Sequence, residues 1–365
     1  MRPAPPVPRK DAGVTALLSS PTMNPRVQVG LFTEFQWAPG MDEAQAFDEA
    51  MAQTIAAEDL GLDAVWLAEI HFQKERSVLS SPLVVAATIA ARTRHMRIGI
   101  AVQVLPLAHP LRLAEDVATL DHLSKGRLDF GVGRSGLPGH YSGFNIPYEE
   151  SRDRFEETLD IVLKAWTEER FTYEGKYFRF HDVCVIPKPY QKPHPPLRFA
   201  ATTRETYLSI GRQGQPIFVA VRTTTISDVT RFIPGYHEGW REAGHPGRGD
   251  VSVIVPVYVA ATDARARDEA RASTVHFFRS IAEALAKGPR KEEAAKLGSM
   301  SYDEILGELT IYGSPESVTE RLLALREALG YSTLAVWMNV GGRIPHERVL
   351  GSMRLFAERV VPRLT

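Results

Sequence analysis

The chain has 365 residues, of which 44% are hydrophobic and 24% charged, proportions that are ordinary for a soluble globular protein. Its 43 basic and 44 acidic residues give a net charge of −1, which provides no overall field for nucleic acid or an anionic membrane. A single cysteine, Cys184, excludes an intramolecular disulfide and a cysteine-rich zinc site, and we interpret it as a packing residue. No apolar run reaches the ~18 residues of a membrane-spanning helix, so we expect a cytoplasmic protein.

The first 25 residues differ in composition from the rest of the chain. They contain six prolines and no hydrophobic periodicity. Such a composition cannot bury enough apolar surface to offset the entropy of folding. We therefore predict a disordered tail over residues 1–25 and a single folded domain over residues 26–365.

Strand-like and helix-like patterns alternate regularly after this tail. The predicted strands are Val27–Glu34, Ala64–Glu69, Met96–Leu105, Arg127–Gly133, Leu197–Ala200, Pro216–Ala220, Val251–Ala260 and Thr333–Asn339. Helical patterns follow them. The first has Phe47, Met51 and Ile55 on one face and ends at Gly61, and the others begin near Pro82, Pro110, Glu149, Thr203, Ile226, Asp263, Ser314 and Pro345. Because near-continuous apolar strands indicate a parallel sheet covered by helices, we predict an α/β fold. Eight strand–helix units favour a single (β/α)8 TIM barrel.

Two segments interrupt the alternation. Phe171–Pro196 follows strand four and contains short aromatic runs and several prolines, which indicates a hairpin and an extended connection. Ser280–Tyr302 is charged, and we predict that it is an insertion after helix seven. The Gly-x-Gly at 131–133 lacks a third glycine, so it is a poor dinucleotide motif. It more plausibly allows a helix or a ligand to approach the strand closely.

In a barrel of this kind, functional residues lie at the carboxyl ends of the strands. These positions combine aromatic and apolar side chains with a few cations and hydroxyls, which suits a flat heteroaromatic ligand carrying a phosphate. They show no metal-ligand spacing and no nucleophile motif, so we predict no metal site. The strand-end residues are Glu34, Phe35, Gln36, Trp37, Glu69, Ile70, His71, Phe72, Val102, Gln103, Val104, Arg134, Ser135, Ala201, Thr202, Thr203, Arg204, Thr206, Arg222, Thr223, Trp337 and Asn339.

Several longer motifs resemble the bacterial luciferase-like family of flavin-dependent monooxygenases. They are VWLAEIHF (Val65–Phe72), the block Val104–Arg134, PKPYQKPHPPLRFAATT (Pro187–Thr203) and YGSPESV (Tyr312–Val318). The resemblance implies a (β/α)8 barrel that takes reduced FMN from a separate NAD(P)H:flavin reductase. It implies that a C4a-peroxyflavin then oxygenates a small organic substrate and that the protein forms a homodimer. It also implies that the segment Ser280–Tyr302 forms a lid over the site, the alternative being a solvated helical excursion without a gating role.

The resemblance also assigns a cofactor site. Arg134 matches the arginine for the flavin phosphate, and a guanidinium is suited to bidentate phosphate binding. The hydroxyl-rich turn at Thr202, Thr203 and Thr206 precedes a helix, whose N-terminus favours an anion. The alternatives are a surface ion pair for Arg134 and simple N-capping by Thr202 or Thr203. The remaining predicted cofactor contacts are Val102, Gln103, Ser135, His140 and Tyr141, the last two of which alternatively shape their loop.

The catalytic prediction rests on Glu69 and His71. The family's Glu-His-His-Phe motif reads Glu69-Ile70-His71-Phe72 here, so the first histidine is replaced by isoleucine. An imidazole generally titrates near neutrality, so His71 suits general acid–base work, and a structural histidine beside Glu69 is the alternative. We expect His71 to be the only protonatable histidine at the flavin, because no other histidine lies at a strand end.

We predict that the substrate site is largely apolar. Trp37, Phe72 and Trp337 would line it, and Arg222 leaves room for an anionic group. Two other functions remain open: a deazaflavin-dependent hydride transfer, which relatives in the same superfamily perform, and non-catalytic flavin binding. We expect no nucleic-acid or membrane partner.

Overall fold

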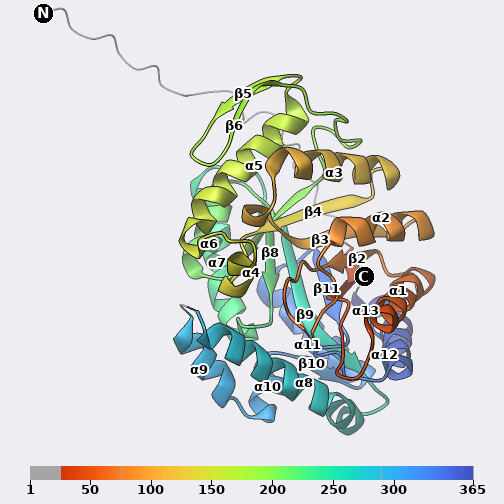
Figure 1. Cartoon of the computed structure of the whole chain (residues 1–365). Helices are drawn as coiled ribbons and strands as arrows, with labels where there is room; N and C mark the ends of the chain where they lie inside the picture. Colours follow the sequence, from red (N-terminus) through yellow and green to blue (C-terminus); the bar gives the residue numbers. More distant parts are fainter. Residues whose placement is uncertain (1–25, 75, 289, 365) are drawn as a thin grey trace, which may run out of the picture.

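The computed structural model describes residues 26–74, 76–288 and 290–364 (Figure 1), so the tail predicted over residues 1–25 lies outside the described residues. Eight parallel strands form a closed barrel, in the order β1, β2, β3, β4, β7, β8, β9, β11, with β11 pairing again with β1. The predicted TIM barrel is therefore confirmed. The barrel strands are β1 (Gln28–Thr33), β2 (Ala64–Leu67), β3 (Arg97–Val104), β4 (Leu128–Gly133), β7 (Leu197–Ala201), β8 (Ile217–Ala220), β9 (Val251–Val259) and β11 (Thr333–Trp337).

A layer of helices surrounds the barrel and buries its outer face. The helices begin where the sequence supplies a cap or a proline: Thr203, Thr225 and Ser314 accept backbone hydrogen bonds as N-caps, and proline opens several others. Their bounds are α1 (Glu43–Asp59), α2 (Pro82–Arg92), α3 (Pro110–Leu123), α5 (Ser151–Thr167), α6 (Arg204–Arg212), α7 (Ile226–Glu242), α11 (Pro315–Leu329), α12 (His346–Arg359) and α13 (Val361–Leu364). No helix in the described chain is long and apolar enough to cross a membrane.

Side chains fill the barrel, so the fold provides no open pore. Trp66 of β2 and Phe218 of β8 are on non-adjacent strands, yet their ring centroids lie 5.0 Å apart across the interior. Gly99 makes room for this contact, because a Cβ there would lie 2.0 Å from the Trp66 ring. Near the amino ends of the strands, Arg198 pairs with Asp250 at 2.7 Å. This ion pair and the rings close the lower end of the barrel, which leaves the carboxyl ends for function.

The connection after β4 has the predicted hairpin, formed by the antiparallel strands β5 (Phe171–Glu174) and β6 (Arg179–Val183). Cys184, directly after β6, is exposed, so the interpretation of this cysteine as a packing residue was wrong. Strand β6 has mostly exposed or half-buried side chains, and the chain after it lies on the outside of the barrel.

The Gly-x-Gly of β4 permits close contact with the neighbouring strand. A Cβ on Gly131 would lie 2.2 Å from the carbonyl oxygen of Ile100, and one on Gly133 would lie 2.4 Å from Val102. Both partners belong to β3, whose register with β4 shifts between Ile100 and Gln103. The close approach predicted for a helix or a ligand is therefore made, in this structure, by a strand.

The insertion near residue 280 begins earlier in the chain than predicted. Directly after β9 come α8 (Asp263–Ala286), α9 (Lys291–Ser299), α10 (Tyr302–Glu308) and a short strand β10 (Ile311–Gly313), which pairs with β9 (Figure 1). Helix α8 contacts β9, β10 and α9, whereas α11 packs beside α7 and α12 in the surrounding layer. The seventh helix of the barrel is thus α11. Helix α8 follows a strand and has a periodic apolar face, so its sequence pattern is the same as that of a barrel helix.

Three short helices lie in the loops after β3 and β4. They are η1 (Leu105–Leu107), α4 (Pro138–Gly143) and η2 (Tyr148–Glu150). Helix α4 carries His140 and Tyr141, both of which are buried. The loop after β4 therefore folds over the barrel mouth instead of extending into solvent.

Candidate active site

A carboxylate–imidazole pair lies at the carboxyl end of β2. His71 Nε2 is 2.7 Å from Glu69 Oε1, and both side chains are buried. The second carboxylate oxygen, Oε2, accepts hydrogen bonds from the backbone N–H of Val104 and from Gln103 Nε2, each at 2.6 Å. These three partners fix the Glu69 carboxylate, which in turn orients the imidazole of His71. The structure therefore brings together Glu69, His71 and Gln103 as predicted site residues.

A second histidine, His140 of α4, lies against this pair. The ring centroids of His71 and His140 are 5.6 Å apart in an edge-on arrangement. His140 Nδ1 is 3.3 Å from Ser135 Oγ, and its Nε2 has no hydrogen-bond partner among the described residues. Burial, together with the charges of His71, Arg76 and Arg222, lowers the pKa of His140 to about 3. The predicted cofactor residue His140 thus lies beside His71, because α4 folds back over the strand ends.

Aromatic rings cover the imidazole of His71 from the solvent side. Phe144 lies edge-on to His71 at 4.9 Å, and Phe72 lies 5.3 Å from Phe144. Phe72 is 62% exposed, and a Cβ on Gly143 would lie 2.1 Å from its ring. The predicted substrate residue Phe72 thus stands at the rim of the mouth, where an exposed ring is available for an apolar ligand.

Strained backbone gathers at the same end of the barrel. Phe35, Phe72 and Ser135 follow β1, β2 and β4, and each has a positive φ, of 47°, 56° and 59° respectively. Left-handed conformations are unfavourable for non-glycine residues and tend to occur at functional sites. The strain therefore supports the barrel mouth as the candidate site.

Arg134 lies at the end of β4. It is half-buried, its Nη1 is 3.3 Å from Ser151 Oγ at the start of α5, and it forms no ion pair with any described residue. Among the described residues, Arg134 therefore does not form the surface ion pair that was the alternative interpretation. The Tyr141 hydroxyl donates a hydrogen bond to the Arg134 carbonyl oxygen, and burial strongly raises the pKa of Tyr141. Tyr141 thus holds the backbone of Arg134, while the guanidinium keeps most of its donors.

The N-terminus of α6 lies on the neighbouring strand of the barrel. β4 pairs with β7, which leads into α6 through Thr202 and Thr203. The Thr203 hydroxyl accepts from the Thr206 N–H and is 2.9 Å from the Thr206 hydroxyl, so Thr203 is the N-cap. Thr202 is exposed and makes no such bond. Arg134 and the helix N-terminus therefore present positive charge and backbone donors at one edge of the mouth.

Val102 and Gln103 belong to the irregular part of β3, which follows a cis peptide between Ala101 and Val102. Val102 lies over Gly133, and Gln103 is buried with its Oε1 unpaired among the described residues. The predicted residues of β3 thus lie between the Glu69–His71 pair and the Arg134 edge. An unpaired buried amide oxygen is a ready acceptor for a ligand N–H.

The other predicted substrate residues have different environments. Trp37 donates its indole N–H to the Met41 carbonyl oxygen in its own loop. Trp337 is completely enclosed, packed against Phe277 at 4.8 Å, and its indole N–H has no partner among the described residues. Arg222, after β8, is one-third exposed. Of these three, Arg222 has the most accessible polar group.

Sequence reasoning missed two cationic contributors to the mouth, Arg76 and Arg290. Arg76, from the β2–α2 loop, pairs with Glu34 through two hydrogen bonds of 2.7 and 3.0 Å. Arg290, from the α8–α9 connection, donates to Thr223 Oγ1 at 3.1 Å. Glu34 was recognised as a strand-end residue without a role. Arg76 and Arg290 lie in loops with no hydrophobic period, so no sequence signal placed them here.

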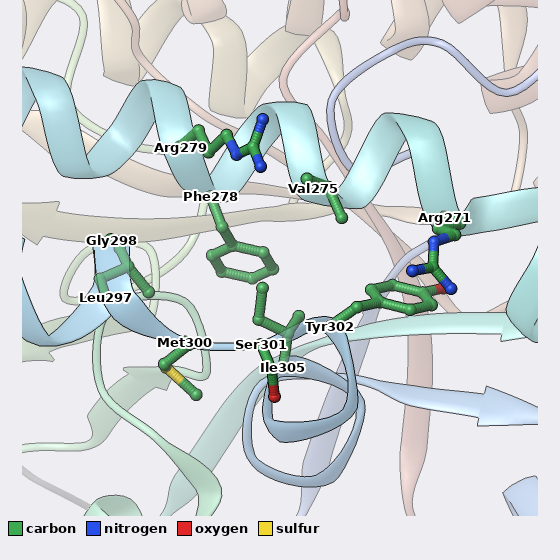
Figure 2. A pocket seen from close by; sticks show the side chains of 10 residues that line it. All are labelled: Arg271, Val275, Phe278, Arg279, Leu297, Gly298, Met300, Ser301, Tyr302 and Ile305. Atoms are coloured by element: carbon green, nitrogen blue, oxygen red, sulfur yellow. The ribbon is translucent and has the colours of Figure 1, made fainter.

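Two pockets adjoin the insertion. One, of about 350 Å³, lies between α8, α9 and α10, and is lined by residues that include Phe278, Met300 and Tyr302 (Figure 2). None of the predicted site residues lines it. The other, of about 150 Å³, is lined in part by Arg76, Phe277 and Gly341, next to β1 and β11. The smaller pocket therefore opens at the barrel mouth.

The fold and the site together define a (β/α)8-barrel oxidoreductase with a buried carboxylate–histidine pair at its mouth. The family model described as luciferase-like monooxygenase matches residues 27–332, and the chain belongs to this family. It is 29% identical over 332 residues to an uncharacterized protein of Sinorhizobium fredii, covering 87% of this chain and 92% of that one. It is 23% identical to the oxygenase component of a flavin-dependent trigonelline monooxygenase of Acinetobacter baylyi, covering 88% and 90%.

Solved structures with the same fold extend over nearly the whole chain. A monooxygenase from Streptomyces bottropensis has a TM-score of 0.80 at 27% identity, covering 93% of this chain and all of that one. The oxygenating constituent of 3,6-diketocamphane monooxygenase of Pseudomonas putida, solved with FMN, has a TM-score of 0.79 at 23% identity, covering 93% and 99%. An F420-dependent secondary alcohol dehydrogenase has a TM-score of 0.71 at 21% identity, also covering 93% and 99%. Fold likeness by itself therefore does not distinguish FMN from a deazaflavin.

Proposed function

We propose that the protein is the oxygenase of a two-component system, which uses reduced FMN and O2 to oxygenate a small, mainly apolar organic substrate. The observation that carries this proposal is the position of Arg134. Among the described residues it has no carboxylate partner, and it lies at the end of β4, beside the strand that leads into the α6 N-terminus. A guanidinium with free donors next to a helix N-terminus is suited to a phosphate monoester. The oxygenase component related to this chain supports a separate reductase as partner.

The described residues fit a flavin phosphate and ring. Arg134 and the N–H groups of the α6 N-terminus at Thr203 would hold the phosphate, with Thr206 and Ser135 beside them. Val102 and Gln103 would contact the ring system, since Gln103 Oε1 is a buried acceptor without a partner in the described chain. Reduced FMN supplies, when bound, the electrons that activate O2.

Glu69 and His71 would manage the proton of the reaction. Glu69 holds His71 Nε2 at 2.7 Å, which fixes the ring orientation and leaves Nδ1 as the nitrogen that exchanges a proton with a ligand. The hydrogen bonds that hold both carboxylate oxygens of Glu69 keep it a positioning group. Phe144 and Phe72 exclude bulk water from the imidazole, which protects the reacting atoms from hydrolysis and side reactions.

Exposed apolar residues on two outer helices support a homodimer, in addition to the proposed flavin reductase partner. Val84 of α2 and Leu123 of α3 are well exposed, although both belong to helices of the surrounding layer. Helices α2 and α3 also contact each other, so the two residues lie on neighbouring helices of the surrounding layer. We propose that the outer surface of these two helices is the dimer interface, as the resemblance implies.

An anaerobic titration tests the proposed function. The protein is titrated with reduced FMN, oxidised FMN and a reduced deazaflavin, and O2 is then admitted while flavin absorbance is followed. We expect reduced FMN to bind most tightly and to reoxidise more slowly on the protein than in solution. Tighter binding of the deazaflavin would favour hydride transfer. Tighter binding of oxidised FMN, with unaltered reoxidation, would favour a non-catalytic flavin carrier.

A further inference from the structure

Two arginines from distant parts of the chain meet at one buried carboxylate, that of Glu34. Arg76 binds Glu34 with two short hydrogen bonds, and its side chain is only 10% exposed. Arg222 reaches the same carboxylate through a single contact of 3.4 Å. Glu34 therefore neutralises Arg76 well and Arg222 poorly, and the group as a whole carries an excess positive charge.

Arg222 keeps most of its binding capacity. A guanidinium has five N–H donors, and the contact to Glu34 uses one of them. One third of the side chain is reached by solvent, although burial and the neighbouring charge of Arg76 lower its pKa to about 10. Its pKa stays far above neutrality, so Arg222 is a cation at pH 7. Such a cation, partly dehydrated and underpaired, is a favourable partner for an anion.

A third arginine approaches from the insertion. Arg290 donates to Thr223, the residue that follows Arg222, and pairs with Glu293 on its own helix α9. A Cβ on Gly136 would lie 2.8 Å from Arg290 Nη1, so Arg290 also contacts the loop after β4. Arg290 thus joins the insertion to two strand-end loops. Its guanidinium also adds to the positive charge around Arg222.

The pocket of about 150 Å³ has the same electrostatic character. Its lining includes Lys74, Arg76 and His276, with Phe277 as its aromatic wall. A basic pocket with one apolar wall matches an anionic headgroup attached to an apolar body. Arg76 belongs both to this pocket and to the group around Glu34, which connects the pocket to the barrel mouth.

We propose that the substrate carries a carboxylate or sulfonate group, which Arg222 binds with Arg76 and Arg290 beside it. The proposal rests on the proposed function, because it describes the substrate of the same site. His140 lies among His71, Arg76 and Arg222, whose charges all act on it. The apolar body of the substrate would then extend towards the rings of His71 and Phe144, whose centroids lie 4.9 Å apart.

Calorimetric titration with two matched pairs tests the proposal: octanoate against octanol, and benzoate against benzyl alcohol. Each is titrated into flavin-free protein and into protein saturated with FMN. We expect at least one acid to bind about tenfold to a hundredfold more tightly than its alcohol, the scale of a charge-assisted contact. The preference should weaken with added salt. FMN affinity is measured separately, so loss of flavin binding would count against the proposed function and not against the anion site.

Variants separate the role of Arg222 from general effects on the fold. Arg222→Met should abolish the preference for the acid, whereas Arg222→Lys should retain part of it, because the charge remains. Arg112→Met, on the exposed face of α3, is the matched control and should leave the preference unchanged. Circular dichroism and FMN affinity report whether each variant is folded. The proposal is overturned if neither acid is preferred over its alcohol, or if folded Arg222→Met keeps the full preference.

Discussion

The imidazole of His140 stands edge-on to that of His71, with 5.6 Å between their ring centroids. The two residues come from different loops, and Glu69 holds only one of them. Burial keeps His140 neutral at pH 7, since it lowers the pKa of this group to about 3. The site thus pairs a histidine fixed by a carboxylate with a neutral histidine whose Nε2 has no partner in the described chain.

The low pKa of His140 makes stability depend on pH. The pKa of an unfolded histidine is about 6.5, so below pH 6.5 the unfolded chain binds a proton that the folded site does not. The free energy of unfolding should therefore fall as the pH drops from about 6.5 towards 3, by up to ~1.4 kcal/mol per pH unit from this group. His140→Gln lacks this contribution, and urea denaturation across pH 7 to 4 should show a shallower slope.

His95→Gln is the control for the His140 variant, because His95 is exposed. It should reproduce the pH slope of the unsubstituted protein. Equal slopes for His140→Gln and the unsubstituted protein would show that His140 titrates normally in the fold.

Replacing His71 tests its assignment as the proton-exchanging group. His71→Asn removes the imidazole and keeps a side chain that hydrogen-bonds to Glu69. We expect oxygenation to slow by about 10²–10⁴-fold, the usual scale for loss of a general acid or base, with more hydrogen peroxide released per O2 consumed. FMN affinity should change little, because the phosphate residues lie on β4 and β7. Near-normal coupling of O2 use to product would make His71 a structural residue.

Position 70 gives a stability prediction. Ile70 replaces the family histidine, is 7% exposed, and belongs to the hydrophobic core. Ile70→His should therefore destabilise the fold by about 2–4 kcal/mol, because it removes apolar packing and buries a polar ring. Thermal unfolding measures the loss. A variant as stable as the parent would show that position 70 faces the cavity.

The residues at the strand ends could be located from the sequence, because each of them directly follows an apolar run of residues. Glu69, Arg134 and Arg222 were found in this way. Arg76 and Arg290 reach the site from loops, so their positions depend on tertiary structure that no local pattern encodes. The three-residue strand β10 is too short for a periodic signal, and α8 has the periodicity of a barrel helix without the position of one.

The N-cap of α6 allows capping to be separated from phosphate binding. Thr203→Val removes the hydroxyl that accepts from the Thr206 N–H, so the unfolding free energy should fall by about 1 kcal/mol. FMN affinity should fall as well if this helix N-terminus holds the phosphate. Thr88→Val, at an exposed threonine of α2, is the control and should change neither quantity. Lost stability with unaltered FMN affinity would leave Thr203 as a cap only.

The most direct measurement compares FMN and riboflavin binding to the unsubstituted protein and to Arg134→Ala. Riboflavin lacks the phosphate, so the two ligands differ only in the group assigned to Arg134. Reduced FMN should bind the variant about tenfold to a hundredfold more weakly, the scale of a charge-assisted contact, while riboflavin affinity stays the same. Unchanged FMN affinity in a folded Arg134→Ala variant would contradict the assignment of the flavin phosphate to this edge of the barrel.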